Sequence, residues 1–166
     1  YTRAIYARDK EALYVNLFIA STYTDEKLSL TIDTAFPISE QVKIHINQAL
    51  KSEQTLNIRV PSWVKSPVQV VYNDQVFEQL EAGYISVTAV FNEGDEIFIT
   101  LPMSLYEYVS MDDEHKIAIM YGPIVLAAQL GCENFPKEDI VSNHLSLMTH
   151  PIIRVPKLVT ESTCID

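Results

Sequence analysis

Alternation of apolar and polar residues is the feature that most constrains the fold of this chain. The alternation is regular within each of three segments, residues 28–34, 42–47 and 55–60. Successive side chains of an extended strand point to opposite faces, so a period of two gathers the apolar side chains on one face. Each segment is therefore predicted to be a half-buried strand of an antiparallel sheet. The aromatic and β-branched run 14–19 predicts a further strand.

The second half of the chain repeats the pattern. Residues 68–72 and 76–77 flank Asn73 and Asp74, a pair that favours a tight hairpin turn. Strands are also predicted at 83–90 and 96–101, on either side of a turn at 92–95 that requires the positive φ accepted by Gly or Asn. Pro102 ends the second of these strands.

Two runs near the end of this pattern are almost continuously apolar. They cover residues 117–121 and 124–127 and flank a Gly-Pro pair. Continuous apolar character predicts central strands that are buried on both faces. Helical signals are few: one turn at 9–13 and a short helix at 136–141. Nearly a dozen short strands with regular turns predict an all-β protein, an antiparallel β-sandwich.

The same rhythm predicts the domain organisation. Residues 14–128 are expected to form the sandwich, and residues 1–13 are expected to be the exit segment of a missing upstream domain. The start at Tyr1, without methionine or signal sequence, suggested a chain cut from something larger. Residues 129–166 are expected to be an irregular linker, with a strand at 152–160 that begins a further β domain. The apolar residues of the N-terminal segment are expected to fold back on the sandwich or to mediate dimers.

Composition excludes several classes of partner. Lys and Arg number 12 against 22 Asp and Glu, for a net charge of −10. An acidic surface repels nucleic-acid phosphates and anionic membranes, and no segment reaches the roughly 20 apolar residues that span a bilayer. Cys132 and Cys164 are the two cysteines, and they are expected to be unpaired thiols. Sequence alone leaves open whether they meet.

Candidate catalytic residues lie where strands are expected to turn. Carboxylates cluster at 112–114 and at Glu93, Asp95 and Glu96. Charged residues concentrate at exposed turns, so solvated loops are expected there. A calcium site at Asp112 and Asp113 is a generic alternative.

Histidine and serine residues show neither a metal-ligand nor a nucleophile pattern. The histidines are His45, His115, His144 and His150, and they show no ligand spacing. Ser62 follows Pro61 at a strand exit and lacks the motif of a nucleophile elbow. The sequence therefore predicts no catalytic, cofactor-binding or metal-binding residue and no cofactor.

The aromatic content raises the question of carbohydrate binding. The chain holds nine Tyr, six Phe and one Trp. Tyr106 and Tyr108 share one face of a short expected strand, and Trp63 caps a strand end. The main expectation is that aromatic side chains fill the core of the sandwich. The alternative is an independent carbohydrate-binding module, and a planar row of exposed Tyr or Trp rings would favour it.

Several segments together resemble a known family. They are residues 13–21, 59–63, 83–84, 93–103 and 118–127. Their order and spacing resemble the region that follows the catalytic barrel in β-L-arabinofuranosidase-like enzymes, glycoside hydrolase family 127. The resemblance covers residues 1–128. Thr88 stands where family members often carry Arg, and Phe91 stands where Trp is usual; both changes leave the expected fold intact.

The resemblance implies a division of labour. Such enzymes carry an N-terminal (α/α)₆ barrel with a zinc-bound cysteine nucleophile and glutamates, and the adjacent-cysteine motif is expected upstream of Tyr1. Neither Cys132 nor Cys164 matches that motif, so no catalytic or zinc residue carries over. The chain is expected to be a non-catalytic accessory domain that is not itself an enzyme. Its expected partner is the upstream catalytic domain, with carbohydrate second and neither nucleic acid nor membrane. The compartment stays open, with a periplasmic or secreted parent as the working expectation.

Overall fold

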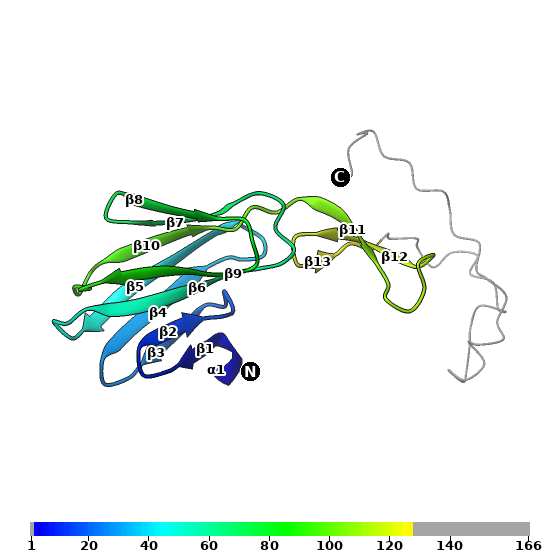
Figure 1. Ribbon diagram of the computed structural model, residues 1–166. Coiled ribbons are helices and arrows are strands. Elements are labelled where there is room, and N and C mark those ends of the chain that lie inside the picture. The colour runs from blue at the N-terminus through cyan, green and yellow to red at the C-terminus, as the bar shows by residue number, and fades with distance from the viewer. Residues whose placement is uncertain (1, 128–166) are drawn as a thin grey trace.

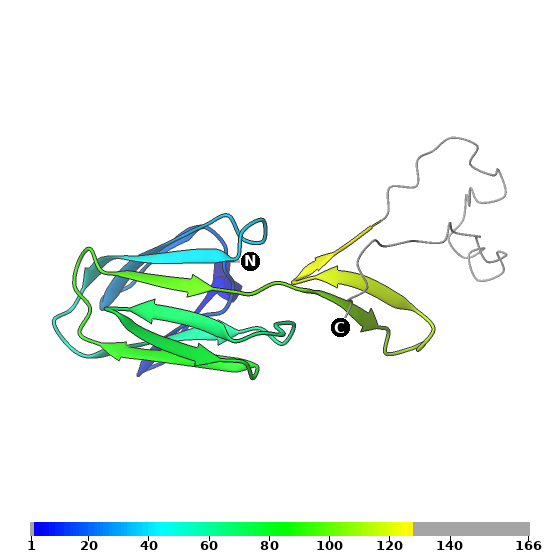
Figure 2. The same cartoon turned by 90° about the horizontal axis from the view of Figure 1, so that it is seen from above.

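The computed structural model describes residues 2–127, which form three β-sheets and one short helix, α1 (Thr2–Ile5). A four-stranded sheet has the order β1 (Tyr6–Arg8), β2 (Ala12–Val15), β6 (Gln54–Val60), β9 (Gly83–Ala89). A six-stranded sheet has the order β3 (Ser21–Thr24), β4 (Leu28–Thr34), β5 (Gln41–Ala49), β10 (Glu96–Thr100), β7 (Val68–Tyr72), β8 (Gln75–Gln79). The small sheet has the order β11 (Leu105–Val109), β12 (Ile117–Tyr121), β13 (Ile124–Val125), and it projects from one end of the two large sheets (Figures 1 and 2).

The predicted all-β sandwich is confirmed. Its core lies between the two large sheets and is built from the apolar positions of the alternating strands. Those positions are Leu28, Leu30 and Ile32 on β4, Val42, Ile44 and Ile46 on β5, and Leu56, Ile58 and Val60 on β6, and all nine are buried. One pairing departs from the antiparallel prediction, because β2 runs parallel to β6. Local alternation fixes which face a side chain takes but not which distant strand lies beside it.

The predicted turns are also confirmed. Asn73 and Asp74 both have positive φ, 48° and 61°, as a two-residue hairpin between β7 and β8 requires. Gly94 has φ 89° in the turn before β10. Asp95 closes that turn, since its backbone N–H donates to the carbonyl of Asn92 at 3.1 Å and its carboxylate accepts from the N–H of Asn92 at 2.8 Å.

The N-terminal segment differs from the prediction. The helical turn expected at 9–13 is wrong, and the strand expected at 14–19 instead spans residues 12–15. Asp9 explains the change, because its carboxylate accepts the backbone N–H groups of Glu11 and Ala12 at 2.8 and 2.7 Å and so favours a turn over a helix. Ile5 and Leu13 are buried, so this segment folds back on its own sandwich.

The small sheet overturns a second prediction. Strands at 117–121 and 124–127 were expected to be buried on both faces, yet Ile117 is 53% exposed and Val125 is 61% exposed. β13 moreover ends at Val125. The sequence pattern was sound in one respect, since β12 is the central strand of its sheet. The sheet has only three strands, and no second described sheet packs across it.

The two departures from the family pattern both lie within the sandwich. Phe91 is fully buried and packs against Tyr72, with ring centroids 5.3 Å apart. Thr88 shares a 2.9 Å hydroxyl hydrogen bond with Thr55 across β6 and β9. The predictions for Cys132, Cys164, His144, His150, the helix at 136–141 and the strand at 152–160 lie outside the described residues.

Candidate interaction surface

The candidate catalytic carboxylates lie in loops and support turns. Asp112 and Asp113 lie between β11 and β12, 3.9 and 3.5 Å from the ammonium of Lys116. Asp95 accepts a 2.7 Å hydrogen bond from the hydroxyl of Tyr72. Burial, followed by this bond, raises the pKa of Tyr72 to about 12. Residues 2–127 bring together no group of three or more His, Cys, Asp or Glu that could hold a metal ion.

The described histidines and Ser62 lie apart from one another. His45 is half-exposed on β5, with Nδ1 3.7 Å from Glu96, which also contacts the ammonium of Lys43 at 3.2 Å. His115 lies in the β11–β12 loop and its backbone N–H donates to Asp113. Ser62 lies in the turn after β6, and no hydrogen bond among residues 2–127 joins it to either described histidine. No helix among residues 2–127 is long and apolar enough to cross a membrane.

Aromatic rings contact one another or a cation rather than forming an open platform. Trp63 stacks on Phe36, with centroids 6.2 Å apart and planes 18° from parallel, and Phe18 meets Phe36 edge-on. The ammonium of Lys65 lies 5.5 Å from the ring centroid of Tyr106, whose hydroxyl donates to a backbone carbonyl. The exposed aromatic residues of the described chain are Tyr84, Phe98 and Tyr108, one from each sheet. Within residues 2–127 they therefore form no planar row.

An apolar cleft lies where the sandwich meets the small sheet. Its volume is about 140 Å³, and Trp63 and Phe36 form its aromatic wall. Pro123, from the turn between β12 and β13, reaches the same cleft. Asn16 and Arg59 add an amide and a guanidinium to the lining. The cleft can therefore accept an apolar group that has a hydrogen-bond acceptor beside it.

Arg59 also belongs to the outer face of the four-stranded sheet, named here the tyrosine face. The strand registers place nine side chains on it: Ala7, Ala12, Tyr14, Thr55, Asn57, Arg59, Tyr84, Ser86 and Thr88. Arg59 carries the one charge among these nine. Ala7, an exposed small side chain at the β1 edge, lies opposite Tyr14 in the strand register. Sequence analysis missed this surface because its members come from four strands that only the topology brings together.

Internal hydrogen bonds order the tyrosine face. The hydroxyl of Tyr84 donates to Asn16 at 2.7 Å, and the hydroxyl of Ser86 donates to Asn57 at 2.7 Å. The rings of Tyr14 and Tyr84 meet edge-on, 5.3 Å apart and 83° from parallel. The hydroxyl of Tyr14 donates to Asp9 at 2.9 Å, and this bond is the main reason that the pKa of Tyr14 is raised. Asn57 is buried although it lies on an outer face.

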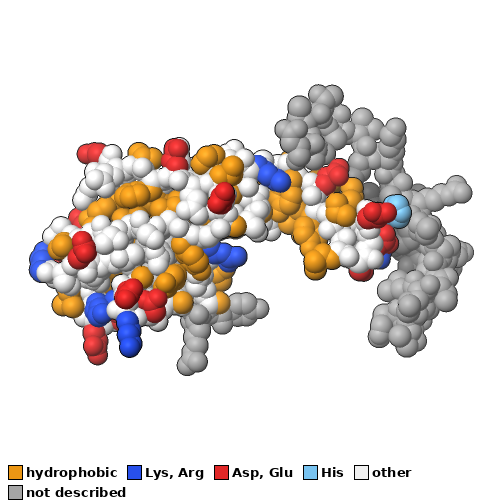
Figure 3. All heavy atoms as spheres, in the orientation of Figure 1, with side chains coloured by type: hydrophobic (Ala, Val, Ile, Leu, Met, Phe, Trp, Pro, Cys, Tyr) orange, Lys and Arg blue, Asp and Glu red, His pale blue; other side chains and the backbone are white. Residues whose placement is uncertain are grey.

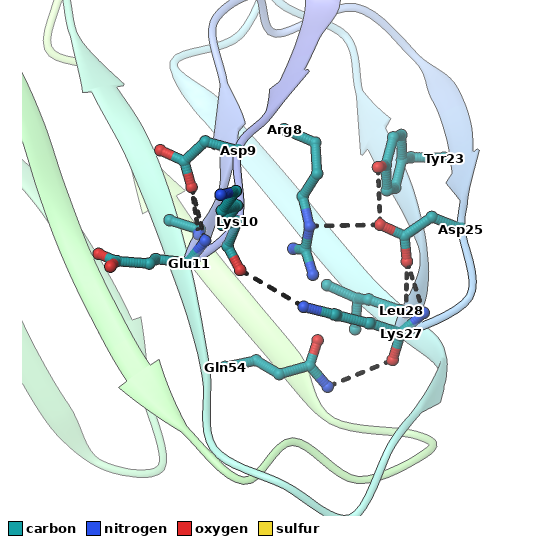
Figure 4. A network of polar contacts seen from close by, with 10 residues as sticks. Arg8, Asp9, Lys10, Glu11, Tyr23, Asp25, Lys27, Leu28 and Gln54 are labelled. Carbon is teal, nitrogen blue, oxygen red and sulfur yellow. Dashed lines mark hydrogen bonds and ion pairs between the residues drawn. The ribbon is translucent and has the colours of Figure 1, made fainter.

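A polar clasp joins the edges of the two large sheets (Figure 4). Arg8 on β1 lies 3.4 Å from the carboxylate of Asp25, which follows β3. That carboxylate also accepts hydrogen bonds from the hydroxyl of Tyr23 and the backbone N–H groups of Lys27 and Leu28. Burial alone would raise the pKa of Asp25, but these donors and Arg8 lower it on balance. Burial and the bond to Asp25 raise the pKa of Tyr23 to about 12.

Comparison with known proteins identifies the family of this chain. The family model for the β-L-arabinofuranosidase GH127 middle domain matches residues 12–103, more than half of the chain. The chain belongs to this GH127 family. The match supports the family resemblance, and it describes a middle domain where the sequence resemblance suggested a C-terminal region. The matched range begins at β2 and ends just before β11, so the GH127 model covers the two large sheets except β1 and does not cover the small one.

Solved structures give the same family. The chain resembles a GH127 β-L-arabinofuranosidase from Geobacillus stearothermophilus T6, with a TM-score of 0.59 and 25% identity over 73% of this chain and 21% of that one. A protein titled glycoside hydrolase and a GH127 β-arabinofuranosidase share the fold, with TM-scores of 0.63 and 0.61 at 22% and 23% identity. Each match covers 73% of this chain and no more than 23% of the other chain. No curated protein matches.

Proposed function

We propose that this GH127 chain is a non-catalytic accessory β-sandwich domain that packs against the (α/α)₆ catalytic domain of a glycoside hydrolase of the β-L-arabinofuranosidase type. In this proposal the domain lies C-terminal to the catalytic barrel and supports it, and a further β domain follows. Hydrolysis of the glycosidic bond belongs to the barrel. The family match and the multidomain length of the similar structures support a parent of this kind.

The observation that carries the proposal is the apolar character of both faces of the small sheet. The register places Leu105, Val109 and Ile117 on one face and Tyr108 and Val125 on the other, and all five are exposed. Figure 3 shows hydrophobic side chains along this sheet and acidic ones at its far loop. Exposed apolar surface of this kind marks a contact with another protein surface. A single supporting domain that is cut free from its neighbours would present such a surface.

The bonding of the polar residues supports a structural role. Asp9, Asp25 and Asp95 bind backbone N–H groups or tyrosine hydroxyls that close turns and join the sheets. A general acid or base must instead face a substrate site. The hydrogen bonds of these three carboxylates stabilise the fold.

Mixing experiments test the proposal. The full chain and a separately made GH127 catalytic domain are titrated together in a calorimeter, and association is expected with an affinity limited by the lost rigid-body freedom of the two partners. A sizing column checks the stoichiometry. Absence of binding at high micromolar concentration, with both parts folded, would refute the packing role. The domain would then be a module that is joined to the barrel only by the chain.

Activity is measured in the same experiments. The chain alone is expected neither to hydrolyse a nitrophenyl arabinofuranoside nor to hold stoichiometric zinc. Turnover that one substitution in this chain abolishes would refute the non-catalytic assignment. Saturable binding of arabino-oligosaccharide by the chain alone would support the independent carbohydrate-binding module instead.

A further inference from the structure

We infer that the tyrosine face is the surface on which the catalytic domain docks, and that the partner presents uncharged side chains to the sheet and a carboxylate to Arg59. This inference rests on the proposed function and assigns the contact with the catalytic domain to the tyrosine face, which leaves the exposed small sheet for contact with another domain. The tyrosine face is distinct from the small sheet, since its nine side chains all belong to β1, β2, β6 and β9.

The tyrosine face differs in charge from the chain as a whole. The chain carries a net charge of −10, yet the nine positions of the tyrosine face include no carboxylate and a single arginine. The centres of protein interfaces are depleted in Asp, Glu and Lys and enriched in Tyr and Arg. The composition of this face therefore matches an interface and differs from that of a solvated surface.

The tyrosine face has an accessible edge and ordered side chains. Ala7 on the edge strand β1 is small and exposed, so another element can approach the backbone closely there. The hydroxyls of Tyr84 and Ser86 are held by Asn16 and Asn57, which fixes their side chains before any partner arrives. Ordered side chains lose little conformational entropy on binding. The surface is therefore preorganised for a protein partner.

Arg59 supplies specificity. Among the described residues it has no ion pair, although the chain as a whole is rich in carboxylates. It lies at the junction of the tyrosine face and the apolar cleft formed with Trp63 and Phe36. A guanidinium in this position matches a carboxylate geometrically, by two parallel hydrogen bonds. An acidic residue beside an apolar side chain is thus the chemistry that fits the guanidinium and the cleft together.

The path of the chain selects the catalytic domain as the occupant. Helix α1 leads directly into β1, the edge strand of the four-stranded sheet (Figure 1). A domain joined ahead of α1 is therefore tethered at the rim of the tyrosine face. A short tether raises the effective concentration of the two surfaces for each other.

A sugar fits this surface less well than a protein does. Sugars stack on open ring faces, whereas Tyr14 and Tyr84 meet edge-on at 83°. The hydroxyls of both tyrosines already donate to Asp9 and Asn16. Few polar groups therefore remain for sugar hydroxyls, and the observations favour a protein partner.

Hydroxyl-radical footprinting of the unaltered protein tests the inference. Tyr84 on the tyrosine face is 41% exposed and Phe98 on the opposite outer face is 48% exposed, so they are matched reporters. Their oxidation rates are compared between the full chain alone and the full-length hydrolase that carries it. The rate at Tyr84 is expected to fall several-fold in the hydrolase, while the rate at Phe98 stays unchanged. Equal reactivity of Tyr84 in both samples would overturn the inference.

Charge reversal gives a second test in the mixed fragments. Arg59→Glu in the full chain is expected to weaken binding of the catalytic domain about tenfold or more, as loss of a desolvated interfacial charge does. Lys43→Glu on the opposite outer face is the control and is expected to change binding little. Far-UV circular dichroism confirms that both variants keep the β spectrum. Arg59→Lys, which keeps the charge but not the paired donors, is expected to lie between Arg59→Glu and the unaltered chain.

The outcomes separate the inference from the proposed function. If the catalytic domain binds but Tyr84 stays reactive and Arg59→Glu binds normally, the accessory role stands and docking uses another surface, with the small sheet as the next candidate. If the unaltered chain does not bind at all, the accessory role fails and the inference fails with it.

Discussion

The outer faces of the two large sheets come from the same alternating pattern but differ in charge. On the six-stranded sheet the outward positions include Asp33, Lys43, His45, Glu78 and Glu96. Lys43 and Glu96 pair at 3.2 Å, and both are 38% exposed. On the four-stranded sheet the outward positions include the single charge of Arg59. A mixed-charge face is typical of water-facing sheet, whereas a face with tyrosines, one arginine and no carboxylate is typical of an interface.

This difference shows where function can be sought in a domain without a catalytic site. Inner positions of both sheets are constrained by packing, and most of them are aliphatic. Outward positions are free of that constraint, so their composition reflects what each face contacts. The comparison predicts that the two sheets respond alike to changes in the core and differently to changes on the surface.

The largest expected effect is in the core and is the same for both sheets. Leu56 on β6 and Leu30 on β4 are both fully buried. Leu56→Ala and Leu30→Ala are each expected to lower the free energy of unfolding by about 2–5 kcal/mol, through lost burial and a residual cavity. Urea denaturation measures both. A cost confined to one variant would mean that the sheets do not share one core.

The next effect is in the clasp that joins the sheet edges. Asp25→Asn is expected to lower the free energy of unfolding at neutral pH by about 1–3 kcal/mol, because it removes a charged hydrogen-bond acceptor and leaves Arg8 without its partner. Asn has nearly the same size as Asp, so the substitution leaves the packing unchanged. Thermal unfolding of the two proteins gives the difference.

The clasp also predicts a pH dependence. The pKa of Asp25 is lowered in the folded chain, so its stabilising contribution is complete above the unfolded pKa of about 4 and is lost as the pH falls through the folded pKa. The unaltered chain is expected to lose stability below about pH 4 more steeply than Asp25→Asn does. Parallel acid limbs in the two proteins would exclude Asp25 as a source of this dependence.

A smaller effect distinguishes the outer faces directly. Asn57 on the tyrosine face is 8% exposed and accepts the hydroxyl of Ser86, whereas Asn47 on the six-stranded face is half-buried and donates to Thr31. Asn57→Ala is expected to cost about 1–2 kcal/mol and Asn47→Ala less than about 1 kcal/mol, because the hydrogen bond of the buried Asn57 side chain competes less with water than that of the half-buried Asn47. Equal costs from urea denaturation would mean that the tyrosine face is no more ordered than the opposite face.

Much of this fold could be predicted from local sequence. The inward positions of β4, β5 and β6 follow from a period of two, and the hairpin at Asn73 and Asp74 follows from the turn that this pair favours. Both signals act over a few residues. The parallel pairing of β2 with β6 was missed because it joins segments about 40 residues apart, and no local pattern selects that partner.

The interaction surface was harder to predict for the same reason. Tyr14, Arg59 and Tyr84 lie in three separate segments of the family resemblance, and each is an outward residue on its own strand. They form one surface only because β2, β6 and β9 are neighbours. The small sheet shows another limit: its continuous apolar strands predicted burial on both faces, and this is wrong among the described residues, which supply no second sheet to cover Ile117.

The smallest expected effect concerns the isolated chain and its surface charges. Lys43→Gln breaks the ion pair with Glu96, but both side chains are partly exposed and screened, so the expected loss is about 0–1 kcal/mol. Arg59→Gln breaks no described ion pair and is expected to cost no more. Urea denaturation at low salt and at about 1 M salt, where charges are screened within a few ångströms, measures this loss. At high salt the free energy of unfolding of both variants is expected to approach that of the unaltered chain. A large cost for Arg59→Gln in the chain alone would mean that Arg59 stabilises the fold, and its charge could then not be assigned to a partner.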